Sequence, residues 1–196
     1  MSFFSQKQLD EYCEKLKNGA VIAFPTDTVW GIGCLPDNKT TCQKIYSIKK
    51  RDGKKPLILL GENMDDFSPY IKDFPPIAKK LADKYWPGAL TIIVKKSPLL
   101  SDDISSGMDS IGLRIPNHPV LLELLQHTGP LATTSANLSG EPPAINFEQT
   151  QDYVGSEVDF IINDFTIASQ GIESTVIIID NDKYKVLRQG AINLQE

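Results

Sequence analysis

The chain has 196 residues, of which 41% are hydrophobic and 23% charged, and it carries a net charge of -5. This length and composition predict one globular domain, residues 1–196, and the overall acidity argues against non-specific nucleic-acid binding over the whole surface. The three cysteines form no Cys-x-x-Cys pair, and neither a signal-peptide pattern nor a long apolar run is present, so we expect a cytoplasmic protein without structural zinc or a membrane segment.

The first elements lead to a polar segment. Ser5 can cap a helix that ends near Asn18, and a buried strand is predicted at 20–24. Residues 26–33 then combine two threonines, Asp27 and two glycines. Ligands bind beyond strand ends in open α/β sheets, so this segment is a candidate binding loop. The alternative is a capped turn that leads into a second strand.

A basic window follows the next helix, which is predicted at 37–48. Residues 49–55 include five basic side chains and one acidic one in an otherwise acidic chain. The window precedes a short strand at 57–60 and therefore lies in a loop, where functional groups are common. Such a cluster is typical either of an anion site or of a solvated turn.

The remaining elements alternate between helices and strands. Helices are predicted at 77–85, 119–128 and 147–154, and strands at 89–95, 110–116, 130–134 and 160–162, followed by a hairpin at 175–180 and 183–187. Residues 97–109 are predicted to form a loop. Arg114 lies in an apolar run and is expected to face an acid or an anionic ligand. Ser135 has no histidine placed to activate it, so we expect a hydrogen-bonding role.

Several motifs together resemble the YrdC-like family of threonylcarbamoyl-AMP synthases. Pro-Thr-Asp-Thr at 25–28 is similar to the family's first motif, and Lys49-Lys-Arg51 with Lys55-Pro-Leu is similar to its Lys-x-Arg…Lys-Pro-Leu segment. Further matches occur in the same order at 86–91, 112–116, 135–140, 171–176 and 187–190. The resemblance covers nearly the whole chain, about residues 20 to 190.

The resemblance implies an α/β fold, with a twisted, curved mixed sheet flanked by helices around one large concave cavity. It also implies three sets of site residues. The signature tetrad would be Lys49, Arg51, Ser135 and Asn137; ATP would contact Arg51, Lys55, Ser135 and Arg188; L-threonine would lie among Thr28, Arg114, Thr133 and Ser174.

The implied reaction joins L-threonine, bicarbonate and ATP into threonylcarbamoyl-AMP and pyrophosphate, for threonylcarbamoyladenosine modification of tRNA. The substrates must be held in line, with positive charge where negative charge develops, and no nucleophilic side chain is needed. Mg²⁺ is expected to accompany ATP without a dedicated protein metal site. Expected partners are the proteins of the tRNA transfer step and tRNA or double-stranded RNA.

Three departures from the family pattern bear on these expectations. The sequence ends soon after Arg188, as in the short form of the family; Pro143 replaces a serine found near the nucleotide in many members; and Leu60 replaces a histidine found near threonine in longer members.

Three alternative functions stay open. They are a non-catalytic double-stranded RNA or tRNA-binding module, a different carbamoyl-transfer enzyme, and a paralogue with another nucleotidyl-transfer substrate.

Overall fold

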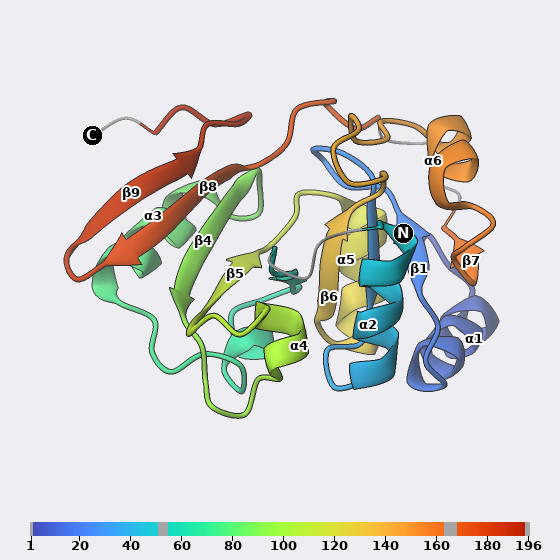
Figure 1. Cartoon of the computed structure of the whole chain (residues 1–196), viewed down its shortest axis with the longest axis horizontal. Coiled ribbons are helices and arrows are strands. Elements are labelled where there is room, and N and C mark those ends of the chain that lie inside the picture. The colour runs from blue at the N-terminus through green and yellow to red at the C-terminus, as the bar shows by residue number, and fades with distance from the viewer. Residues whose placement is uncertain (1, 51–54, 163–167, 195–196) are drawn as a thin grey trace.

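A nine-stranded mixed sheet forms the centre of the protein, in the strand order β7-β1-β2-β6-β3-β5-β4-β8-β9 (Figure 1). The computed structural model describes residues 2–50, 55–162 and 168–194. The strands are β1 Ile22–Phe24, β2 Gly31–Cys34, β3 Ile58–Leu60, β4 Leu90–Lys95, β5 Ser110–Arg114, β6 Leu131–Ser135, β7 Phe160–Ile161, β8 Thr175–Asp180 and β9 Lys183–Arg188.

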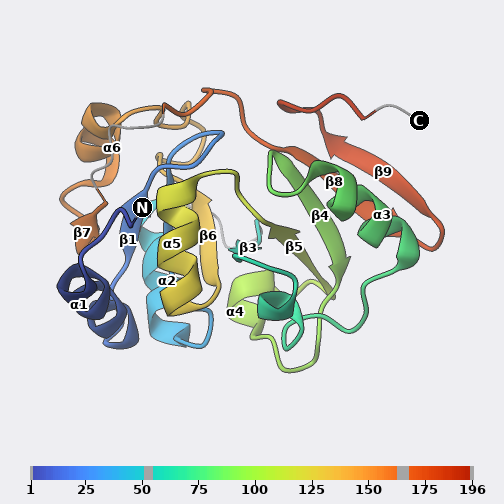
Figure 2. The ribbon, with the colours of Figure 1, turned by 180° about the vertical axis from the view of Figure 1, so that it is seen from behind.

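Helices cover both faces of this sheet. In Figure 1 α2 lies in front of the sheet, whereas in the reverse view of Figure 2 α5 lies in front of it. The helices are α1 Gln6–Lys17, α2 Lys39–Ile48, α3 Pro76–Tyr85, α4 Asp102–Ser105, α5 Pro119–Thr128 and α6 Phe147–Val154, with a 3₁₀ turn at Asp65–Phe67. The predicted mixed α/β fold with a helix-flanked sheet is therefore confirmed.

The local expectations agree with the structure, with one correction. Ser5 forms a capping box with Gln8 at the start of α1, and Asn38 caps α2 through a hydrogen bond from the Thr41 N–H. The 97–109 segment, predicted to be a loop, contains the one-turn helix α4, because the Ser101 side chain accepts a hydrogen bond from the Asp103 N–H. Residues 26–33 form a polar turn that leads directly into β2, and the Thr28 N–H donates to the Thr26 hydroxyl within this turn, as the capped-turn alternative predicted.

Two apolar cores lie on the sheet. One packs Leu16 of α1 and Leu121 and Leu124 of α5 against Phe24 and Leu131. The other includes buried side chains of α2, such as Ile45, together with Ile32 and Ile92 from the sheet. Burial of these side chains removes apolar surface from water, and this is the main term that holds α2 and α5 in place. Within the described ranges, no helix is long and apolar enough to cross a membrane.

The register of the central strands brings distant residues of the chain together. Thr133 of β6 is paired with Gly33 of β2 on one side and with Ile58 of β3 on the other. A Cβ atom at position 33 would lie 2.8 Å from the Thr133 methyl group, so glycine is needed for this close approach. Arg114, at the end of β5, is paired with Leu60 of β3. Polar side chains from separate motifs thus meet along the middle of the sheet.

Candidate active site

A small cavity of about 70 Å³ lies among the β1–β2 connection, the end of β5 and strand β6. A buried water needs roughly 10–15 Å³ on such a scale, so the cavity suits a small polar molecule. The apolar part of the cavity wall includes Phe24, Trp30 and Leu60. The polar lining includes Thr26, Thr28, Arg114, Thr133, Ser174 and Arg188.

Arg114 is fixed by a buried network at the edge of the small cavity. Its Nη2 donates to Asp27 Oδ1 at 2.5 Å, and its Nε donates to the Gly88 carbonyl at 2.9 Å. The Arg114 side chain is about 5% exposed. Burial lowers the pKa of Arg114, and the Asp27 carboxylate opposes this shift. The acid that the sequence predicted opposite Arg114 is therefore Asp27.

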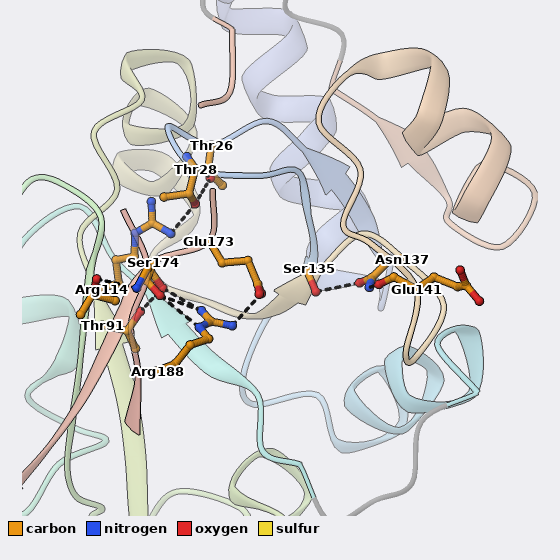
Figure 3. Close-up of polar contacts among 12 residues, drawn as sticks. Thr26, Thr28, Thr91, Arg114, Ser135, Asn137, Glu141, Glu173, Ser174 and Arg188 are labelled. Carbon is orange, nitrogen blue, oxygen red and sulfur yellow. Dashed lines mark hydrogen bonds and ion pairs between the residues drawn. The ribbon is translucent and has the colours of Figure 1, made fainter. Parts of the chain in front are cut away.

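Thr28 connects Arg114 to Thr26 in a chain of hydrogen bonds (Figure 3). Arg114 Nη1 donates to Thr28 Oγ1 at 2.8 Å, and the two threonine hydroxyls lie 2.9 Å apart. The single proton of the Thr26 hydroxyl goes to the Val29 carbonyl at 2.7 Å. Thr28 must therefore be the donor to Thr26, and its hydroxyl can only accept one further hydrogen bond.

A large cavity of about 390 Å³ adjoins the small one and shares seven lining residues with it. Its size suits a nucleotide or a similar ligand. The shared residues are Ile58, Thr133, Thr134, Ser135, Glu173, Ser174 and Arg188. Lys49, Lys55 and Asn137 line the large cavity alone, so its described basic side chains are Lys49, Lys55 and Arg188.

Lys49 is buried and is directed into the loop that follows β6. Its Nζ donates to the Ser135 carbonyl at 2.5 Å, to Asn137 Oδ1 at 2.6 Å and to the Asn137 carbonyl at 3.0 Å. The Ser135 hydroxyl in turn donates to Asn137 Oδ1 at 2.7 Å. Lys49 is about 3% exposed, and the described hydrogen bonds of its ammonium group are all with this loop. Three members of the predicted tetrad thus form one connected unit.

Arg188 is held beside Ser174 where the two cavities meet (Figure 3). Its Nε and Nη2 donate to the Ser174 carbonyl at 3.1 and 3.0 Å, and its Nη1 donates to Glu173 Oε1 at 2.6 Å. Arg188 Nη2 also reaches the Ser174 hydroxyl, which lies 2.8 Å from Thr91 Oγ1. The guanidinium is partly exposed and remains accessible to a ligand in either cavity.

The structure brings together nine of the ten predicted site residues. Arg51 lies outside the described residues. Leu60 lines the small cavity as an apolar wall, whereas Pro143 lines neither cavity. Sequence reasoning assigned no role to Thr26, Asp27, Thr91 or Glu173. Thr26 and Asp27 lie in the segment singled out as polar, and Glu173 precedes a predicted ligand residue, so the segments were recognised but the side-chain partners were not.

The family model Sua5/YciO/YrdC, described as "Telomere recombination", matches residues 14–190. This chain belongs to the Sua5/YciO/YrdC family. A family relative from Methanocaldococcus jannaschii is 36% identical over 194 residues, which cover 97% of this chain and 90% of the relative.

Two further members of the Sua5/YciO/YrdC family carry informative names. The Vibrio campbellii protein "Threonylcarbamoyl-AMP synthase" is 34% identical over 187 residues, which cover 94% of this chain and 100% of that protein. The crystal structure of Pyrococcus abyssi Sua5 complexed with L-threonine superposes with a TM-score of 0.89 at 28% identity. That match covers 95% of this chain and 55% of the P. abyssi chain, so this chain spans about half of the longer protein.

Proposed function

We propose that this protein is a threonylcarbamoyl-AMP synthase, which joins L-threonine, bicarbonate and ATP into L-threonylcarbamoyladenylate and pyrophosphate, with loss of water. The observation that carries the proposal is the pair of adjoining cavities, one of amino-acid size and one of nucleotide size, with a shared wall. Membership of the family and the names of its members support the same reaction. The continuous sheet supports treating residues 1–196 as one domain.

The small cavity is the proposed threonine site, formed by Thr28, Arg114, Thr133 and Ser174. Arg114 uses three of its five N–H donors in its described hydrogen bonds, which leaves donors for the substrate carboxylate. The threonine hydroxyl donates to Thr28, because Thr28 has no proton of its own left to give. A buried acceptor of this kind discriminates against amino acids that lack the hydroxyl.

The large cavity is the proposed ATP site. Arg51, Lys55 and Arg188 bind the phosphates, and Ser135 adds a hydrogen bond. Lys49 and Asn137 hold the loop that carries Ser135 in place. Among the described residues, no group of three or more His, Cys, Asp or Glu side chains is placed to hold a metal ion, so Mg²⁺ would be bound through the phosphates and water.

The chemistry follows from the contact between the two cavities. The threonine amine takes up CO₂ or bicarbonate to form a carbamate, and a carbamate oxygen then attacks the α-phosphorus of ATP and displaces pyrophosphate. The protein contributes by holding the reactants in line and by placing fixed positive charge beside the phosphates. The product would pass to partner proteins that transfer the threonylcarbamoyl group to tRNA in the cytoplasm.

A threonine-dependent pyrophosphate release assay in bicarbonate buffer tests this function. We expect pyrophosphate to appear only when L-threonine, bicarbonate and ATP are all present. Pyrophosphate release that does not depend on L-threonine would indicate a paralogue with another substrate. Salt-dependent RNA binding by a folded protein that consumes no ATP would instead indicate a non-catalytic RNA-binding module.

A further inference from the structure

Glu173 is the acidic side chain that lines both cavities. Among the described lining residues of the two cavities it is the one carboxylate, whereas basic side chains line each of them. Figure 3 shows the Glu173 side chain between Arg188 and Ser135, in the middle of the site. A carboxylate beside a triphosphate site is unfavourable unless a positively charged group accompanies it.

The position of this carboxylate is set from two sides. Arg188 Nη1 donates to Oε1, and the Glu173 carbonyl accepts a hydrogen bond from the Ala191 N–H at 3.0 Å. A Cβ atom at position 190 would lie 2.2 Å from the Glu173 carbonyl oxygen, so only glycine allows the end of the chain to pack so closely. The described hydrogen bond of this side chain uses Oε1 only, so Oε2 can accept a hydrogen bond from a ligand.

The other described side chains that line the small cavity are cationic or neutral, so none of them supplies a negative charge for a positively charged substrate group. Arg114 and Arg188 can only donate, and they suit a carboxylate or a phosphate. Thr28 can accept one hydrogen bond, which suits a hydroxyl. An amino-acid substrate also carries a positively charged amine with three donors, and it needs a negative partner inside the protein.

We propose that Glu173 binds the amine of the amino-acid substrate and directs it toward the large cavity. This inference rests on the proposed function and assigns the third polar group of the substrate. Arg114 takes the carboxylate, Thr28 takes the hydroxyl and Glu173 takes the amine. Because Glu173 borders both cavities, an amine bound to Oε2 lies next to the nucleotide phosphates that its carbamate must reach.

The test compares two ligands in wild-type protein and in Glu173→Gln by calorimetric titration. The ligands are L-threonine and (R)-3-hydroxybutyrate, which is threonine without its amine. We expect the variant to bind L-threonine about 10-fold more weakly, the loss typical of one charge-assisted hydrogen bond. Its affinity for (R)-3-hydroxybutyrate should stay the same or rise, because a negative charge has been removed near an anion.

Glu157→Gln is the matched control, since Glu157 is exposed and lines neither cavity. Glu173→Asp, which retracts the carboxylate by one methylene, is the second variant and should also weaken L-threonine selectively. An equal loss for both ligands would overturn the proposal, because it would mean that Glu173 only holds Arg188. Unchanged threonine affinity with an altered Mg²⁺ requirement would overturn it in favour of a metal ligand.

The wild-type protein separates this inference from the proposed function. Threonine-dependent pyrophosphate release by wild type, together with equal effects of Glu173→Gln on both ligands, would reject the amine assignment alone. A wild-type protein that neither binds L-threonine nor releases pyrophosphate would reject both.

Discussion

Lys49 and Asn137 are joined by two hydrogen bonds, from Nζ to Oδ1 at 2.6 Å and to the backbone carbonyl at 3.0 Å. Lys49 is the C-cap residue of helix α2, and Asn137 follows strand β6, so this contact connects the helix end to a loop that lines the large cavity. The described part of the basic window therefore combines a buried side chain, Lys49, with an exposed one, Lys55, and both line the large cavity.

Lys49→Ala should damage both the site and the fold. The substitution leaves buried oxygens of Ser135 and Asn137 without their donor, which costs about 1–3 kcal/mol of unfolding free energy. We expect pyrophosphate release to fall about 100-fold, because the loop that carries Ser135 loses its anchor. Urea unfolding and the release assay measure the two effects. Lys50→Ala is the control, since Lys50 is exposed, and an equal loss in that variant would contradict the role of Lys49.

Arg51→Ala should reduce pyrophosphate release about 100-fold or more, as expected when a charge-stabilising donor is removed from the transition state. The unfolding midpoint should stay within error of wild type, in contrast to Lys49→Ala. Arg51→Lys should recover only part of the activity, because an ammonium group cannot form the paired contacts of a guanidinium with phosphate. Full turnover in Arg51→Ala would exclude a role in phosphate binding.

Asp27→Asn should destabilise the protein and weaken threonine binding. The change leaves the buried Arg114 guanidinium without its counter-charge, and breaking such a pair typically costs about 3–5 kcal/mol. We expect a lower urea midpoint and a raised KM for L-threonine, because the guanidinium is no longer held in place. Asp102→Asn is a useful comparison, since that carboxylate is exposed in its ion pair with Lys96. A variant as stable as wild type would show that Asp27 does not position Arg114.

Thr28→Val should reduce the discrimination between L-threonine and L-2-aminobutyrate, which lacks the hydroxyl. The variant removes the acceptor for the substrate hydroxyl, so the ratio of kcat/KM values should fall about 10-fold. Thr28→Ser keeps the hydroxyl and should retain most of the ratio. Thr26→Val removes the hydroxyl that accepts the Thr28 proton, so the Thr28 hydroxyl becomes able to donate as well as accept. This variant should therefore also change the ratio of kcat/KM values. An unchanged ratio in Thr28→Val would reject the hydroxyl assignment.

The sequence by itself determined the strands, most of the helices and the order of the polar segments. The Ser5 cap and the short buried strands between the helices are local signals, and the structure contains each of them. The one-turn helix α4 was missed, because four residues are too few to show the periodic apolar pattern that distinguishes a helix from a turn. Nine of the ten residues that the motifs predicted for the site line one or both of the two cavities.

Only the tertiary structure decided what those residues contact. Asp27 and Arg114 are separated by 87 positions, and Lys49 and Asn137 by 88, so no local pattern could pair them. The strand order of the sheet and the packing of α2 on it place these side chains together, and burial then requires that each charge and each hydroxyl find a partner. That requirement explains why Lys49 holds the Ser135 loop and why the Thr28 hydroxyl can only accept one further hydrogen bond.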